Sequence, residues 1–160
     1  MIGNVATEVI SHDFQRRIVF NAARRKADQL GLKLLNYGSG MSYKYIYENS
    51  DINADIVPRD IPNFMQVPLN GFLRIPLPDK SCVVYSAHTL EHVEHPEGLM
   101  EEFRRISDHI YVITPSPLFL AAWLVPEHRW VYIGGRKVSN PLHKIAQIYR
   151  EPYRVLFRGA

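Results

Sequence analysis

The chain has 160 residues and a formal net charge of +3, and 46% of its residues are hydrophobic. This composition excludes an intrinsically disordered chain, and the length predicts a single domain over residues 1–160. The one cysteine, Cys82, excludes both an intramolecular disulfide and a cysteine-rich zinc module. No apolar stretch approaches the length that spans a bilayer, and no secretory signal pattern opens the chain, so we expect a cytoplasmic protein with no membrane partner.

Residues 5–30 have the pattern of an amphipathic helix. Apolar side chains recur at four-residue spacing, at Ile10, Phe14, Ile18 and Ala22. Gly31 stands where the C-terminus of a helix is expected. We predict that this N-terminal part, residues 1–31, covers one face of a sheet with that apolar stripe.

Four short segments have the length and punctuation of strands: residues 33–37, 52–57, 82–86 and 109–114. The first is followed by glycines, and the second stops at Pro58. The last two are apolar on both faces, which is typical of strands buried between two layers of helices.

Residues 96–107, between the last two strands, are predicted to form a helix. Proline stands at its start, Glu101 is placed to pair with Arg105, and one face carries the apolar residues Leu99, Phe103 and Ile106. Because such crossovers are right-handed, the flanking strands are expected to be parallel neighbours. The fold class that follows is α/β, a doubly wound, mostly parallel sheet with helices on both faces.

The last part of the chain, residues 117–160, contains an apolar segment at 118–125, then an expected strand at 130–133, a helix at 141–150 and a strand at 153–157. The apolar segment fits a lid over a hydrophobic acceptor, or alternatively a core helix or the surface of a homodimer. Seven basic residues and one acidic residue lie between positions 129 and 160. Because apolar residues separate these charges, we expect weak nucleic-acid binding or none.

The residues that follow the strands are expected to form one site, because ligands bind outside the carboxyl ends of the strands of open parallel sheets. Three such segments are Asn36-Tyr37-Gly38-Ser39-Gly40, Asp55-Ile56-Val57-Pro58 and Ser86-Ala87-His88. Paired glycines let a backbone approach a ligand closely, and the Asp55 carboxylate can accept hydrogen bonds from a ribose diol.

These segments, together with the sequence Ile-Pro-Leu-Pro-Asp-Lys-Ser-Cys-Val at 75–83 and His-Thr-Leu-Glu-His-Val at 88–93, resemble a short branch of the class I S-adenosylmethionine-dependent methyltransferases. The resemblance covers residues 33–116 and implies a Rossmann-like, cofactor-binding core with a shortened C-terminal part. It implies that residues 38–40 pass under the methionine and ribose, that Asp55 holds the ribose hydroxyls, and that residues 86–88 lie beside the transferred methyl. The full set of implied cofactor-binding residues is Asn36, Gly38, Ser39, Gly40, Asp55, Ile56, Asn70, Gly71, Ser86, Ala87 and His88.

The function that the resemblance implies is transfer of a methyl group from S-adenosylmethionine to a small-molecule acceptor, with S-adenosylhomocysteine as the product. His88 and His128 are the catalytic candidates. The family's usual acids are replaced at Asn36, Asn70 and Val83, and its third glycine is Ser42. Two alternatives therefore stand beside this one: a degenerate binding protein without catalysis, and a nucleic-acid methyltransferase.

His88 and His92, four positions apart with Glu91 between them, also match the His-x-x-Glu-His pattern of inverted zinc peptidases. That class requires a third ligand far downstream, and the sequence offers no convincing carboxylate for it. We therefore expect no metal site.

Overall fold

The structure is a computed structural model, which describes residues 2–40, 43–67 and 74–143. Within this part, the chain forms two compact units. The first comprises residues up to 89 together with 93–113, and the second comprises residues 90–92 together with those from 114 onward. The expectation that residues 1–160 form a single domain stays a prediction. None of the described helices is long and apolar enough to cross a membrane.

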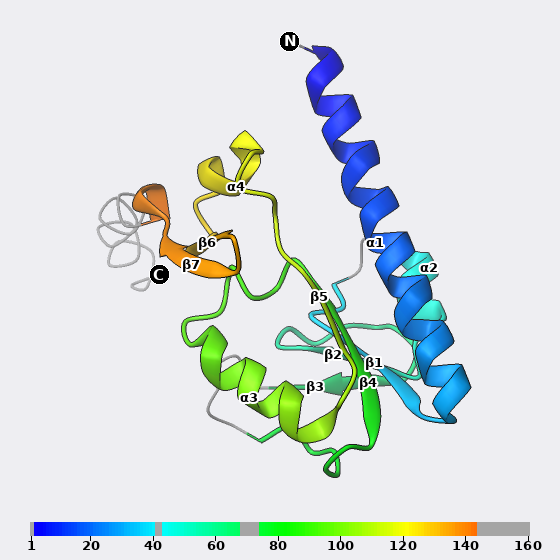
Figure 1. Cartoon of the computed structure of the whole chain (residues 1–160). Coiled ribbons are helices and arrows are strands. Elements are labelled where there is room, and N and C mark those ends of the chain that lie inside the picture. Colours follow the sequence, from blue (N-terminus) through cyan, green and yellow to red (C-terminus); the bar gives the residue numbers. More distant parts are fainter. Residues whose placement is uncertain (1, 41–42, 68–73, 144–160) are drawn as a thin grey trace, which may run out of the picture. The chain divides into compact units, whose positions relative to one another are not determined.

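A parallel sheet of five strands forms the centre of the first unit (Figure 1). Its strands are β1 (Lys33–Tyr37), β2 (Ile52–Asp55), β3 (Phe64–Gln66), β4 (Cys82–Ala87) and β5 (Ile110–Ile113). They lie in the order β3-β2-β1-β4-β5, and every pair of neighbours is parallel. The α/β class, the first two strands and the parallel pairing of β4 with β5 are thus confirmed.

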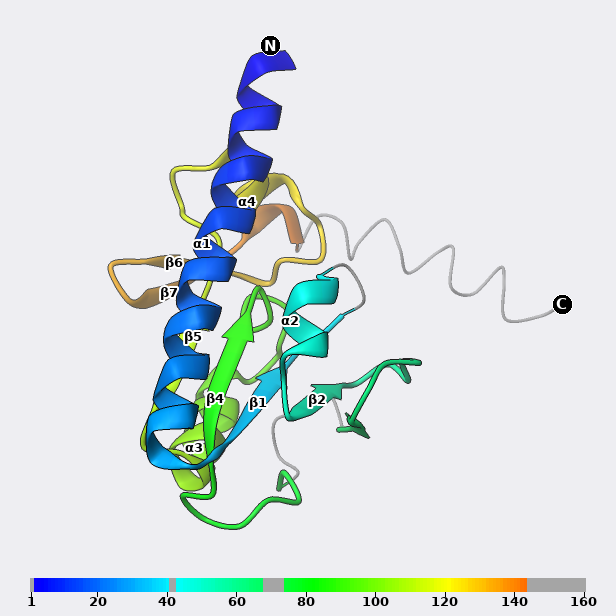
Figure 2. The same cartoon turned by 90° about the vertical axis from the view of Figure 1, so that its right-hand side faces the viewer.

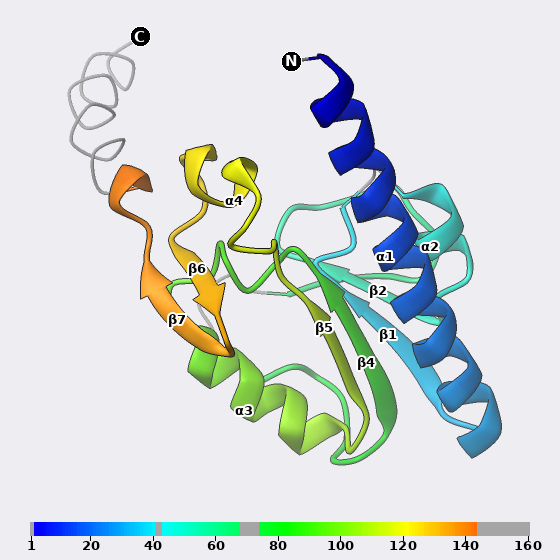
Figure 3. The same cartoon turned by 45° about the horizontal axis from the view of Figure 1, so that its top comes forward.

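Helices cover both faces of this sheet, as the sequence predicted. Helices α1 (Ile2–Leu30) and α2 (Lys44–Glu48) lie on one face, and α3 (Pro96–Ile106) lies on the other (Figures 2 and 3). Helix α3 begins at Pro96 and buries Leu99, Phe103 and Ile106, as expected from its apolar spacing. The ring of Phe103 meets that of Tyr37 on β1 edge to face, with 5.1 Å between centroids.

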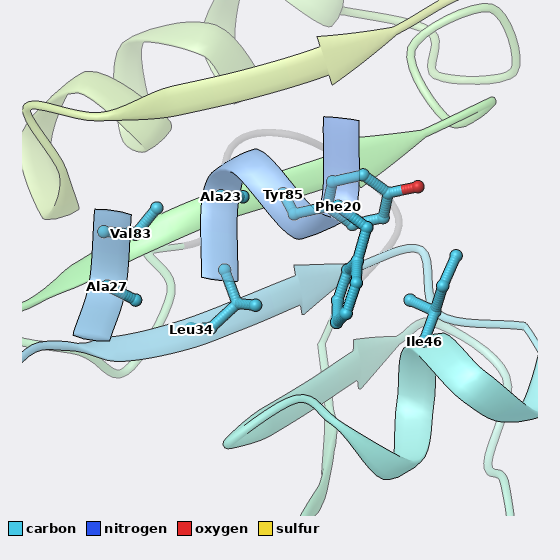
Figure 4. Close-up of a cluster of buried hydrophobic side chains, with 7 residues drawn as sticks. All are labelled: Phe20, Ala23, Ala27, Leu34, Ile46, Val83 and Tyr85. Atoms are coloured by element: carbon cyan, nitrogen blue, oxygen red, sulfur yellow. The ribbon is translucent and has the colours of Figure 1, made fainter. Parts of the chain in front are cut away.

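Helix α1 packs on the sheet through a face that the sequence analysis did not predict. Phe14 and Ile18 are 65% and 51% exposed, whereas Phe20, Ala23 and Ala27 are buried. These three contact side chains of the sheet and of α2 in one cluster, completed by Leu34, Ile46, Val83 and Tyr85 (Figure 4). Strict four-residue spacing drifts around a helix of 3.6 residues per turn, so the side chains from Phe14 to Ala22 do not stay on one face.

Two polar contacts of Asp51 join helix α1 to the starts of β1 and β2. The Asp51 carboxylate accepts hydrogen bonds from the Leu34 backbone N–H at 2.7 Å and from Arg24 of α1 at 2.5 Å. Burial opposes the charge on Asp51, but these two donors outweigh it and hold the pKa of the carboxyl below its ordinary value.

On the other face, Arg105 of α3 holds the chain segment that leads into β4. Its guanidinium donates to the backbone oxygens of Ile75 and Leu77 at 2.9 and 3.0 Å and pairs with the carboxylates of Glu102 and Asp79. Glu102 in turn accepts from the Ile75 N–H at 2.7 Å. The partner of Arg105 on its own helix is therefore Glu102, three residues earlier, and not the predicted Glu101, because Glu102 faces the segment that both residues bind.

The second unit contains helix α4 (Leu120–Leu124) and an antiparallel hairpin of β6 (Trp130–Ile133) and β7 (Arg136–Ser139). Strand β6 confirms the predicted strand, whereas β7 was not predicted. Gly134 and Gly135 form the turn with φ of 56° and 79°, the left-handed conformation that two-residue hairpin turns require. The predicted helix at 141–150 extends beyond the described residues, and the predicted strand at 153–157 lies wholly outside them.

Candidate functional site

The order of the five strands reverses between β1 and β4. The chain runs from β1 outward through β2 to β3, and then returns to place β4 on the other side of β1. Lys33 pairs with Cys82 and Tyr37 with Ser86, so the two strands end side by side. In open α/β sheets, the carboxyl ends of the strands at such a reversal border the ligand crevice.

The turn after β1 is fixed to the end of β2 by its backbone. The N–H groups of Gly38 and Ser39 donate to the Ala54 oxygen at 2.8 and 3.1 Å, and the Gly40 N–H donates to Asp55 Oδ2 at 2.9 Å. The predicted association of the glycine pair with Asp55 is therefore present in the structure.

The two glycines of this turn are required for different reasons. Both have positive φ, 74° at Gly38 and 54° at Gly40. A Cβ atom on Gly38 would lie only 2.0 Å from Oγ1 of Thr89, whereas a Cβ on Gly40 would meet nothing within 4 Å. Gly38 thus lets the end of β4 approach closely, and Gly40 borders open space.

Asp55 stands at the end of β2 with its carboxylate buried. Oδ2 accepts from Gly40, Oδ1 accepts from the Val57 N–H at 3.1 Å, and Arg59 Nε lies 3.7 Å from Oδ2. Since each carboxylate oxygen has two lone pairs, both oxygens keep capacity for a further donor. Burial, reinforced by the Asp55 charge, raises the pKa of Tyr37 to about 12, so this phenol stays neutral beside the carboxylate.

Two buried hydroxyls lie in the segments that end β1 and β4. Ser39 and Ser86 are 7% and 1% exposed, and neither Oγ has a hydrogen-bond partner among the described residues. A buried hydroxyl without a partner costs about 1–3 kcal/mol, so such groups are normally satisfied by a ligand or by water. Both residues lie at the strand ends where open α/β sheets bind ligands.

His88 directly follows β4 and Ala87. Its φ is 55°, in the left-handed region that few residues other than glycine adopt, and its N–H donates to the Ile113 oxygen at 2.8 Å. Backbone strain of this kind is concentrated at functional sites. The predicted site residues of β4, Ser86 to His88, therefore lie at a strained strand end beside the glycine turn.

Asn36 is buried, and its side chain is used within the sheet. Its Nδ2 donates to Asn53 Oδ1 at 2.9 Å, and Asn53 donates to the backbone oxygens of Tyr47 and Pro62, each at 2.8 Å. This amide network joins β1 to β2. That Asn36 also contacts a cofactor stays a prediction.

The remaining predicted site residues are Ile56, Asn70, Gly71 and His128. Ile56 is half-buried after β2, and its backbone oxygen accepts from Gln66 Nε2 at 3.3 Å. Asn70 and Gly71 lie outside the described residues. His128 belongs to the second compact unit, whereas His88 belongs to the first. The structure thus gathers the ends of β1, β2 and β4, and a shared role of the two histidines stays a prediction.

Two features of the structure, one in each unit, were not predicted from the sequence. The side chain of Thr89 lies where a Cβ atom on Gly38 would stand. Thr89 belongs to the matched His-Thr-Leu-Glu-His segment, but no role was predicted for it. In the second unit, Glu91 and His92 lie beside His128, with one possible ligand atom of each within 4.8 Å of the others. His88, the partner that the zinc-peptidase pattern gave to His92, does not belong to this group.

Comparison with known protein families gives no match for the chain, and no curated protein matches it.

Proposed function

We propose that the protein is a Rossmann-like, class I methyltransferase that transfers a methyl group from S-adenosylmethionine to a small-molecule acceptor. The observation that carries the proposal is the pair of buried hydroxyls, Ser39 and Ser86, which have no hydrogen-bond partner among the described residues and lie in the segments that end β1 and β4 at the strand reversal. The sequence motifs at 75–83 and 88–93 indicate the class of cofactor.

The residues at this edge of the sheet fit the polar groups of S-adenosylmethionine. Gly40 leaves open space over the turn, and the Asp55 oxygens can still accept from a ribose diol. Ser39 and Ser86 can each donate and accept a hydrogen bond. Both side chains are already buried in the described structure, so few side-chain rotamers are lost on binding.

When bound, the cofactor supplies an electrophilic methyl group on a sulfonium. The contribution of this chain is to hold it and to position an acceptor in line with the carbon–sulfur bond, since methyl transfer depends chiefly on alignment and exclusion of water. His88, fixed in its strained conformation at the end of β4, is the residue that we assign to the methyl side of the site.

The proposal is tested by titrating the folded protein with S-adenosylhomocysteine in a calorimeter and by following its melting temperature. We expect binding and an upward shift, because a ligand that binds only the native state stabilises it. Asp55→Asn should weaken binding roughly 10- to 100-fold, the cost of a hydrogen bond to a charged acceptor. Ser86→Ala should weaken it up to about tenfold.

Ser81→Ala is the matched control, since Ser81 directly precedes β4 and bonds to the Pro78 oxygen, away from the strand reversal. Its affinity for S-adenosylhomocysteine should equal that of the wild type. A folded wild-type protein that neither binds this ligand nor shifts its melting temperature contradicts the proposal.

The degenerate alternative, a scaffold that binds without catalysis, is favoured by the use of Asn36 in the amide network with Asn53. Release of S-adenosylhomocysteine from S-adenosylmethionine distinguishes the two. Turnover with a panel of small-molecule acceptors supports the enzyme, turnover with an RNA pool alone supports a nucleic-acid methyltransferase, and binding without turnover supports the scaffold.

A further inference from the structure

Glu91, His92 and His128 of the second unit form a compact group, of which only His128 was a catalytic candidate for the methyl transfer. Glu91 is fully buried at 0% exposure, His128 is 8% exposed, and His92 is partly exposed. One possible ligand atom of each lies within 4.8 Å of the other two. A side-chain shift of the order of 1 Å would bring three such atoms onto one ion at bond lengths of about 2.0–2.2 Å.

Both imidazoles are oriented by backbone oxygens. Nδ1 of His92 lies 3.1 Å from the Glu127 oxygen, and Nδ1 of His128 lies 3.1 Å from the Ala122 oxygen. Because a carbonyl only accepts, each neutral ring carries its hydrogen on Nδ1 and keeps the lone pair on Nε2. Metal-bound histidines are held in this way, with the second ring nitrogen donating to a carbonyl or carboxylate.

The backbone fixes Glu91 to the segment that carries His128. The Glu91 oxygen accepts hydrogen bonds from the N–H groups of Arg129 at 2.7 Å and Trp130 at 3.3 Å. The rings of His92 and His128 meet edge to face, with 4.9 Å between centroids. Two chain segments far apart in the sequence are thus locked together with their ligating groups on the same side.

We propose that Glu91, His92 and His128 bind a divalent transition-metal ion, with Zn²⁺ as the ion that fits best. Two imidazoles and one carboxylate are the protein ligands of many zinc sites that keep a fourth position for water or substrate. Calcium and magnesium prefer ligand sets made wholly of oxygen, so two nitrogen ligands disfavour them. The partly exposed His92 gives the ion a path from solvent.

The test uses the full chain with no affinity tag, since a histidine tag binds zinc itself. The protein is treated with a chelator, dialysed, and titrated with ZnCl₂ in a calorimeter, and a parallel sample is titrated with CoCl₂ and followed by visible absorption. We expect one ion per chain and the strong d–d bands of low-coordinate cobalt with nitrogen and oxygen ligands.

His92→Gln and His128→Gln should each weaken zinc binding by about 100-fold or more, because even loss of an outer-sphere partner costs 10- to 100-fold. His92 is partly exposed, so this variant should keep the native circular dichroism spectrum and decide the matter if a buried variant fails to fold. His95→Gln is the matched control, since His95 is exposed and lies outside the group. It should bind as the wild type does.

Three results would overturn the metal site: a wild-type protein that binds no stoichiometric zinc, a cobalt spectrum equal to that of the hydrated ion, or an equal loss of zinc affinity in His92→Gln and His95→Gln. Any of them would leave the group as a carboxylate and two histidines packed together without an ion. Titration with S-adenosylhomocysteine in the presence of chelator measures binding at the proposed cofactor site without metal. The metal proposal and the methyltransferase proposal can therefore fail independently.

Discussion

Replacing Gly38 with alanine tests the close approach between the turn after β1 and the end of β4. An alanine in the left-handed region costs about 1–2 kcal/mol. Gly38→Ala also places a Cβ atom 2.0 Å from Thr89 Oγ1 and 2.9 Å from its Cγ2. Forced overpacking of this kind adds about 1–3 kcal/mol, so we expect a loss of about 2–5 kcal/mol in the free energy of unfolding.

Gly40→Ala is the internal reference, because Gly40 shares the positive φ but has open space around its Cβ position. It should cost about 1–2 kcal/mol only. In urea unfolding, the double variant Gly38→Ala/Thr89→Ala should recover the overpacking part, which gives a coupling energy of about 1–3 kcal/mol. Equal losses in the two glycine variants, or no coupling with Thr89, would refute the contact.

Two further predictions concern the contacts of α3. Arg105→Met should lower the free energy of unfolding by about 2 kcal/mol, mainly through the backbone bonds of its guanidinium, whereas Glu101→Gln should change it by less than about 0.5 kcal/mol in the same urea titration. Arg105, helped by the Ile75 N–H, holds the pKa of Glu102 below its ordinary value of 4.5, although burial opposes this. A lowered folded-state pKa stabilises the native state above the unfolded-state value, and this stabilisation is lost as the pH falls through the folded-state value. Wild type should therefore lose more stability than Arg105→Met between about pH 6 and about pH 3, and parallel curves would contradict the pairing.

Strands β1, β2, β4, β5 and β6 and helix α3 could be predicted because their signals are local, whereas β3 was not predicted. The segments that became β1 and β4 are short apolar runs bounded by glycine or polar residues, and α3 has proline at its start and three apolar residues on one face. The order of the strands followed from the handedness of the crossover for β4 and β5 only. The place of β1 between β2 and β4 depends on contacts far apart in the sequence.

The buried face of α1 could not be predicted from its apolar spacing. The sheet accepts Phe20 together with two alanines, whose small side chains let the helix backbone approach, and leaves the larger Phe14 and Ile18 exposed. Hydrophobic size is therefore a poor guide where a helix lies close to a sheet. Strand β7 was not predicted, although Gly134 and Gly135 after β6 are a two-residue signal for a hairpin and therefore for a second strand.

For the candidate site, the sequence predicted which segments meet, but it did not predict the burial or the hydrogen bonds of their side chains. The motifs singled out Ser39, Asp55 and Ser86. Burial of the two serine hydroxyls with no partner in the described part of the chain is a property of packing and has no local pattern in the sequence. The approach of His128 to Glu91 and His92 likewise depends on folding of the second unit, so the sequence showed only the local pair of His88 and His92, from which no metal site was predicted.

The burial of Cys82 at the start of β4 has a consequence for following the motions of the sheet. This thiol lies within the central pair of strands, donates to the Ile106 oxygen, and has its pKa raised to about 11, chiefly by burial. Only an exposed thiolate reacts with a maleimide or a disulfide reagent. Because the chain contains no other cysteine, labelling of the natural protein reports the openings that expose this thiol beside the end of α3. When closing is faster than labelling, the rate gives the free energy of that opening, and comparison with the urea value reveals whether this part of the unit opens alone or only with the whole unit.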